Sequence, residues 1–125
     1  MIFGIGTDIV AIARMAEYWQ RHGERGLEKI LAPDEREGCR SSNDPARFLA
    51  KRFAAKEALG KAFGTGIRVP LLLPEITISH DELGKPFFTL APALAAHFSD
   101  RQLLAHLSIS DEQEYAVAFV ILESS

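Results

Sequence analysis

The chain has 125 residues, of which 47% are hydrophobic and 25% charged, with a formal net charge of −3 at pH 7; these values are typical of one soluble globular domain. No apolar run approaches the roughly 20 residues of a membrane span, and the acid at position 8 argues against a signal peptide. The single cysteine, Cys39, excludes an internal disulfide framework, and no Cys/His spacing indicates zinc. We therefore expect a single cytoplasmic domain over residues 1–125.

Residues 2–10 are predicted to form a strand that places Gly4, Gly6 and Asp8 on one face. Because glycine weakens a strand, the two glycines predict a close approach by another backbone or by a ligand. The Gly-x-Gly pattern is not a dinucleotide fingerprint, since the third glycine is missing. Asp8 is a poor strand former, which leaves two interpretations: a functional carboxylate, or a cap for the helix that follows.

A helix is predicted over residues 11–22, with apolar residues at helical spacing. Arg14 and Arg21 lie off this apolar stripe, where they either meet an acidic partner or remain in water. A further helical piece is expected over residues 25–31. A short helix then begins at Pro33, with acidic residues in its first turn, where the helix dipole favours them.

The strongest helix signal spans residues 45–63. Asp44 can cap its start, and Gly64 suits a left-handed residue at its end. Two apolar sides on the helical wheel predict burial by two layers, with Glu57 in the middle of one side. A carboxylate in that position needs a cation or a metal; the alternative is an i,i+4 ion pair with Lys61 on a partly wet surface.

Charge is distributed unevenly along the chain. Residues 1–68 hold 12 basic and 9 acidic residues, whereas residues 69–125 hold 2 and 8. The helix over residues 45–63 alone carries five basic residues against Glu57. This pattern predicts a phosphorylated ligand or an acidic partner, with a solvated helix face as the alternative.

The loop Gly64-Thr65-Gly66 follows this helix. Its backbone N–H groups would form a phosphate cradle, although a helix end followed by a turn produces the same letters. No repeat or linker interrupts the remaining sequence. Five more elements are predicted: strands over residues 75–79, 87–90, 103–109 and 115–122, and a helix from Pro92 to about Phe98.

Several segments together carry a family resemblance. They are Gly-Ile-Gly-Thr-Asp-Ile-Val at 4–10, a stretch containing Lys-Arg-Phe-Ala-Ala-Lys-Glu-Ala at 47–67, Gly-Lys-Pro at 84–86, Leu-Ser-Ile-Ser-Asp at 107–111 and Tyr-Ala-Val-Ala at 115–118. In this order and spacing, the chain resembles the holo-(acyl-carrier-protein) synthases, the short single-domain 4′-phosphopantetheinyl transferases. The match runs from residue 2 to about residue 123.

The resemblance implies an α+β fold in which an antiparallel sheet packs against helices, one of them long and central. It implies the transfer of 4′-phosphopantetheine from coenzyme A to a serine of acyl carrier protein, with release of adenosine 3′,5′-bisphosphate and a requirement for magnesium. The attacking serine belongs to the carrier, so this chain needs no nucleophile. The family also assembles as a homotrimer with active sites between subunits.

The resemblance also assigns site residues. Asp8 and Glu57 are the implied magnesium ligands, and Lys61 reaches the phosphates as a catalytic cation. Arg14 is the implied contact for acyl carrier protein, and Arg21 follows two turns later on roughly the same face. The residues implied to bind coenzyme A are Arg52, Lys61, Gly64, Thr65 and Gly66.

Some alternatives stay open at this level. The proton acceptor is either a magnesium-bound water held by Glu57 or Glu57 itself. Many members of the family carry His where this chain has Asp111; this residue is either a third metal-directed carboxylate or a turn-forming Asp. Rival interpretations of the whole chain are a non-enzymatic module that binds RNA or an acidic protein, and a structural subunit. Neither gives Asp8 and Glu57 a role.

Overall fold

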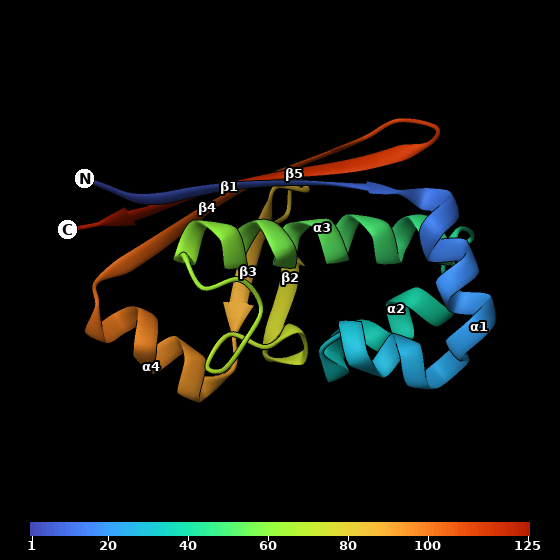
Figure 1. Cartoon of the computed structure of the whole chain (residues 1–125), viewed down its shortest axis with the longest axis horizontal. Coiled ribbons are helices and arrows are strands. Elements are labelled where there is room, and N and C mark those ends of the chain that lie inside the picture. The colour runs from blue at the N-terminus through green and yellow to red at the C-terminus, as the bar shows by residue number, and fades with distance from the viewer.

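The long helix α3, Pro45–Phe63, is the element on which the other elements pack (Figure 1). In the computed structural model, which describes residues 1–125, the N–H of Arg47 donates a hydrogen bond to the Asp44 side chain and so caps the helix. Gly64 ends the helix in the left-handed region, with φ of 98°. Both ends therefore lie where the sequence predicts them.

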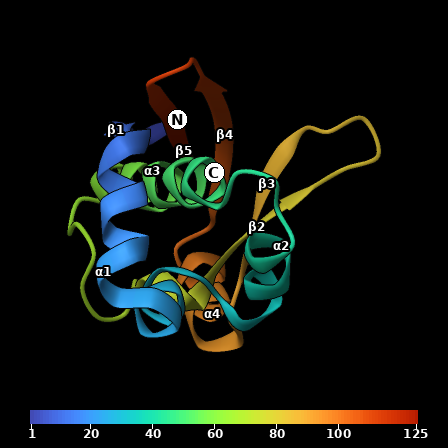
Figure 2. The same ribbon diagram turned by 90° about the vertical axis from the view of Figure 1, so that its right-hand side faces the viewer.

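Two antiparallel sheets accompany α3. The larger has the strand order β1-β5-β4, and the smaller is the β2–β3 hairpin, whose turn projects away from the rest of the chain (Figure 2). This arrangement confirms the predicted α+β class, with two sheets instead of one. The strands are β1 (Ile2–Ala11), β2 (Ile76–His80), β3 (Pro86–Leu90), β4 (Leu103–Asp111) and β5 (Tyr115–Ser124).

The remaining helices pack around α3 and the hairpin. Gly23, with φ of 55°, breaks the first helix into the two helical pieces that the sequence predicts. Across this break the Tyr18 hydroxyl donates to the Gly26 carbonyl at 2.9 Å. No helix combines the length and the apolar character that crossing a membrane requires. The helical segments are α1 (Ile12–Ile30), η1 (Pro33–Glu35), α2 (Arg36–Arg40), η2 (Leu73–Glu75) and α4 (Pro92–Asp100).

Strand β1 lies directly on the backbone of α3. A Cβ atom at Gly6 would overlap the carbonyl oxygen of Ala58 and stand 2.8 Å from the amide nitrogen of Ala62, and one at Gly4 would overlap the carbonyl oxygen of Ala62. The predicted close approach by another backbone is therefore confirmed. It brings the strand residue that follows on the same face, Asp8, onto the C-terminal half of α3.

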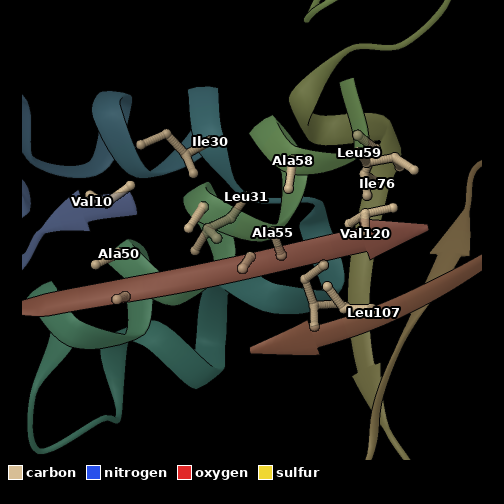
Figure 3. Packing of buried hydrophobic residues seen from close by; sticks show 14 of the residues in the cluster. Val10, Ile30, Leu31, Ala50, Ala55, Ala58, Leu59, Ile76, Leu107 and Val120 are labelled. Atoms are coloured by element: carbon tan, nitrogen blue, oxygen red, sulfur yellow. The ribbon is translucent and has the colours of Figure 1, made fainter. Parts of the chain in front are cut away.

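The core lies between α3 and the inner face of the larger sheet. Ala55, Ala58 and Leu59 of α3 meet Val120 and Leu107 of the strands (Figure 3). Because α3 uses small residues here, the sheet approaches closely on one side. The helix α1 covers another side, as the two apolar sides of the helical wheel predict.

The outer face of the larger sheet is apolar and uncovered. Ile5 and Ile9 of β1 are 59% and 62% exposed, and Phe119 of β5 is 43% exposed. The strand register sets Ile5 opposite Ile121 and Phe119 opposite Thr7, so these side chains share one face. Contiguous apolar surface of this kind is typical of an interaction site.

Candidate active site

Asp8, Glu57 and Lys61 meet where β1 crosses α3. The alternation of β1 turns Asp8 toward the helix, where the Lys61 ammonium donates to Asp8 Oδ1 at 3.1 Å and to the Thr7 carbonyl at 2.9 Å. Lys61 therefore pairs with Asp8, and the i,i+4 pair with Glu57 considered from the sequence is wrong. Asp8 is not a helix cap either, because α1 begins after Ala11 without a side-chain cap.

Glu57 lies in an electrostatic environment that opposes its charge. Burial raises the pKa of Glu57, and the negative charge of Asp8 raises this pKa further, while Lys61 and Arg14 act in the opposite direction. Only Asp8 of the two acids has an ion-pair partner. A cation between the two carboxylates would relieve their repulsion, so the electrostatics of this pair favour metal binding.

The oxygen donors of this pair fit magnesium. This ion typically binds one or two carboxylates and completes its octahedral shell with water and substrate phosphate. No group of three or more His, Cys, Asp or Glu side chains exists in the structure that could hold a metal alone. Asp8 and Glu57 would therefore supply the protein ligands, and the remaining positions would be left to water and substrate.

A groove of about 420 Å³ lies beside this pair, between α1 and α3. The exposed side chains of Arg14 and Arg21 line it, together with Lys29 and the apolar Tyr18 and Phe53. Arg14 also lowers the pKa of Glu57, so the groove and the carboxylates are in electrostatic contact. Neither Arg14 nor Arg21 forms an ion pair within the chain, which leaves both charges available to an acidic partner.

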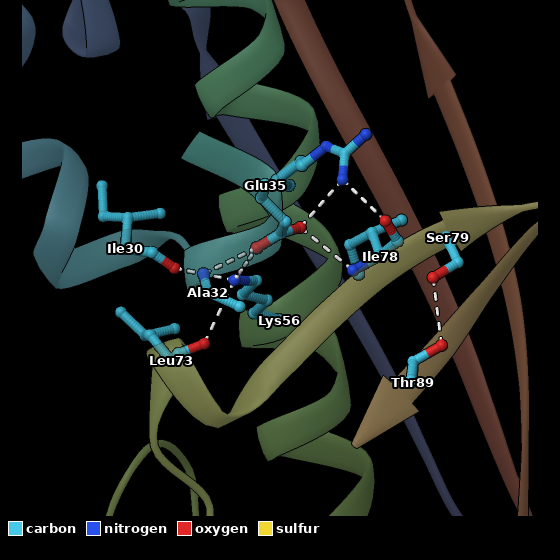
Figure 4. Close-up of polar contacts among 9 residues, drawn as sticks. Ile30, Ala32, Glu35, Lys56, Leu73, Ile78, Ser79 and Thr89 are labelled. Carbon is cyan, nitrogen blue, oxygen red and sulfur yellow. Dashed lines mark hydrogen bonds and ion pairs between the residues drawn. The ribbon is translucent and has the colours of Figure 1, made fainter. Parts of the chain in front are cut away.

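A second polar cluster is internal, and the sequence did not predict it. Figure 4 shows Glu35 between Lys56 of α3 and Ile78 of β2. The fully buried Lys56 donates to Glu35 Oε1 at 2.6 Å, and Arg52 donates to Glu35 Oε2 at 2.9 Å. Burial lowers the pKa of Lys56 to about 8, although Glu35 opposes this effect.

One feature of the sequence indicates this cluster, namely the position of Lys56 on the helical wheel. On the helical wheel of α3, Lys56 falls on the same side as Leu49 and Phe63, both of which are buried. A lysine on an apolar side needs a counter-charge from another element. Nothing local in the sequence identifies Glu35 as that counter-charge, because its place in a first helical turn already accounts for it. The five basic residues of α3 are therefore not a uniform solvated face.

Arg52 also lines a cavity of about 300 Å³ at the N-terminal half of α3, together with Arg47, Lys51 and His80. Arg47 is already neutralised there by Asp111 at 2.8 Å, and Asp111 also lies 3.7 Å from Lys51. Since β4 and β1 are opposite edges of the sheet, Asp111 is not beside Asp8. Within one chain Asp111 is therefore no third ligand beside Asp8 and Glu57, and it links the β4–β5 hairpin to α3.

The amides of the loop after α3 make the hydrogen bonds of a helix C-terminus. The N–H groups of Gly64 and Gly66 both donate to the Gly60 carbonyl, at 3.1 and 3.0 Å. Two of the three amides of the predicted phosphate cradle are therefore occupied. Of the two interpretations of Gly64-Thr65-Gly66, the structure therefore agrees with a helix end followed by a turn.

An antiparallel sheet crossed by one helix, with two carboxylates and a lysine at the crossing and basic residues beside it, suits an enzyme that acts on phosphorylated substrates. The family model of the 4′-phosphopantetheinyl transferase superfamily matches residues 4–120. The chain therefore belongs to this superfamily, and the resemblance seen in the sequence is confirmed.

Within the superfamily, holo-[acyl-carrier-protein] synthases match the whole chain. The synthase of Azoarcus sp. (strain BH72) is 57% identical over 124 residues, which cover 99% of each chain. The crystal structure of the synthase from Neisseria meningitidis has a TM-score of 0.95 at 43% identity and covers 99% of this chain and 100% of that one. The structure from Bacillus anthracis, in complex with CoA (3′,5′-ADP), has a TM-score of 0.84 at 37% identity, with coverage of 100% and 99%.

Proposed function

We propose that this protein transfers 4′-phosphopantetheine from coenzyme A to a serine hydroxyl of acyl carrier protein, releasing adenosine 3′,5′-bisphosphate. The carrier would serve fatty acid synthesis in the cytoplasm. The observation that carries the proposal is the meeting of Asp8, Glu57 and Lys61 at the crossing of β1 and α3, in a chain that matches holo-synthases along its full length. Synthase structures from Bacillus anthracis and Helicobacter pylori in complex with coenzyme A support the same donor.

In this proposal Asp8 and Glu57 hold magnesium. When bound, the ion would neutralise charge on the phosphates of the donor. Lys61 now binds Asp8, and its half-exposed ammonium would turn to a phosphate oxygen of the donor. The serine oxygen forms the new bond to phosphorus as the bond to the leaving phosphate breaks. Glu57 takes the serine proton directly or through a water that it holds.

Coenzyme A is expected to bind through its phosphates to Lys61 and Arg52. These residues lie on opposite sides of α3, so in the homotrimer proposed below one ligand would meet them on different copies of the chain. Arg52 lines the basic cavity at the N-terminal half of the helix, while Lys61 lies at the C-terminal half. The loop of Gly64, Thr65 and Gly66 follows directly, so these residues are expected beside the nucleotide. Because two of the loop amides bind Gly60, we expect packing against the nucleotide there and not a cradle for phosphate.

Two surfaces fit the proposed partners. The groove lined by Arg14 and Arg21 suits an acidic acyl carrier protein, because both arginines are exposed and unpaired. The uncovered apolar face around Ile5, Ile9 and Phe119 suits contacts between copies of the chain. We propose a homotrimer built through this face, with active sites between subunits.

The test is a mass measurement. Apo acyl carrier protein, coenzyme A and magnesium are incubated with the enzyme, and the carrier should gain the mass of phosphopantetheine. The gain should stop with a chelator and in Asp8→Asn. If carrier binds while its mass stays unchanged under all conditions, the chain is a binding module and the proposed transfer is wrong.

A further inference from the structure

Glu35 stands at the centre of a buried charge network that the catalytic proposal does not use. Its Oε1 accepts from the Lys56 ammonium at 2.6 Å and from the Ala32 N–H at 2.9 Å. Its Oε2 accepts from Arg52 at 2.9 Å and from the Ile78 N–H at 3.0 Å. Each carboxylate oxygen therefore binds one cation and one backbone amide, and both cations come from the same side of α3.

The donors of Arg52 are divided between the interior and the cavity. Its Nη1 donates to Glu35 and, at 2.6 Å, to the Ile78 carbonyl. The Nε and Nη2 donors bind no protein group, yet they are not buried, because the side chain is 15% exposed at the wall of the cavity. Glu35 thus holds one edge of a planar guanidinium and leaves its remaining donors facing outward.

Arg52 and Lys51 are the cations in this cavity with donors to spare, and of the two Arg52 is the one held by a buried partner. Arg47 uses all three of its nitrogens on Asp44, Asp111 and the carbonyls of the β4–β5 turn. Lys51 lies 3.7 Å from Asp111, which is too long for a hydrogen bond, so its flexible ammonium is also available to an anion. An anion that enters the cavity therefore finds unused N–H donors on Arg52, in a direction that Glu35 fixes.

The charge balance of the network requires Lys56. A lone Glu35 would neutralise Arg52 and so cancel its attraction for an anion. Lys56 is fully buried, with Glu35 and the carbonyls of Ile30 and Leu73 as its hydrogen-bond partners, so it neutralises Glu35 from the interior. The three side chains then carry a net positive charge, which the exposed edge of Arg52 presents.

We propose that Glu35 and Lys56 are positioning residues for coenzyme A: Glu35 aims the Arg52 guanidinium into the cavity, and Lys56 preserves its charge for a phosphate group. This inference rests on the proposed function, because it takes Arg52 as a contact of the nucleotide. Pre-orienting a charged donor removes the cost of ordering it when the ligand binds. Loss of the Glu35–Lys56 pair should therefore weaken the binding of coenzyme A.

The test is a double-mutant cycle on coenzyme A binding, measured by calorimetry on the full chain. Removing both buried charges in Glu35→Gln with Lys56→Met avoids an orphan charge in the core, so this pair of substitutions is the variant that should fold. It is combined with Arg52→Ala. We expect each of these two changes to raise the Kd for coenzyme A about tenfold or more, and their combination to raise it no further than Arg52→Ala alone. The KM for carrier protein should stay within about twofold, which would show that the loss is specific to coenzyme A.

The outcomes separate the two levels of the proposal. If Arg52→Ala weakens coenzyme A binding but the paired variant leaves it unchanged, or if the two effects multiply, the positioning role is wrong and the proposed function stands. If Arg52→Ala itself has no effect on the Kd, the placement of the nucleotide fails, and the positioning role fails with it. Thermal unfolding of each variant shows whether any lost affinity reflects lost folding.

Discussion

Replacing Gly6 by Ala tests how tightly the contact between β1 and α3 controls the site. The new Cβ would overlap the Ala58 carbonyl oxygen and lie 2.8 Å from the Ala62 amide nitrogen, whereas ordinary contacts begin at 3.4 Å. Both neighbours are helix backbone and cannot rotate away, so strand and helix must separate by roughly 1 Å. Overpacking of this kind typically costs about 1–3 kcal/mol, and a misplacement of about 1 Å at a catalytic group can cost about a hundredfold in rate.

The assay has two parts. Urea unfolding of Gly6→Ala should give a free energy of unfolding lower by about 1–3 kcal/mol, and the transfer rate at saturating substrates should fall by about tenfold to a hundredfold, since Asp8 moves away from Glu57. Gly38→Ala is the matched control, because its Cβ would meet only the ring of Phe48, at 3.1 Å. Wild-type stability and rate in Gly6→Ala would refute the view that this backbone contact positions the carboxylate.

Three further predictions concern charge. Asp8→Ala and Glu57→Ala should each lose most transfer activity while keeping a wild-type melting temperature; near-normal activity in both would reject them as metal ligands. Arg14→Glu with Arg21→Glu should raise the KM for carrier protein, leave that for coenzyme A nearly unchanged and flatten the salt dependence of the carrier KM; an unaltered salt dependence would place the carrier elsewhere. In the fold, Lys56, the Ile78 amide and Arg52 outweigh burial and lower the pKa of Glu35, so its stabilisation is present above about pH 4.5 and lost as the pH falls. Glu35→Gln with Lys56→Met should flatten the loss of unfolding free energy in acid, measured by urea titration at several pH values, and an unchanged acid limb would contradict this.

The sequence predicted the fold where local chemistry determines it. Asp44 and Gly64 define the ends of α3, and alternation in β1 places Asp8 on the inner face, because caps and strand periodicity depend only on neighbouring residues. The glycines of β1 predicted a close backbone contact, although only the structure identifies α3 as the neighbour.

The parts that the sequence did not predict depend on contacts between distant elements. The sequence allowed an ion pair between Lys61 and Glu57. Lys61 pairs with Asp8 because of the way in which β1 crosses α3. The pairing of Lys56 with Glu35 joins residues 21 positions apart, and neither residue has a local pattern that requires the other. The division of α3 charges into buried, neutralised and available groups likewise follows from tertiary packing.

The break at Gly23 also affects how a docked carrier would act on the site. The first part of α1 continues directly from β1, so Arg14 lies six residues after Asp8 along one uninterrupted strand-to-helix segment. Both parts of α1 pack in the core, the first through Ile12 and Met15 and the second through Leu27 and Ile30. A partner that presses on Arg14 therefore acts on the strand that holds Asp8, the proposed metal ligand, with no loop between them. We expect carrier docking and the placement of Asp8 to be mechanically coupled.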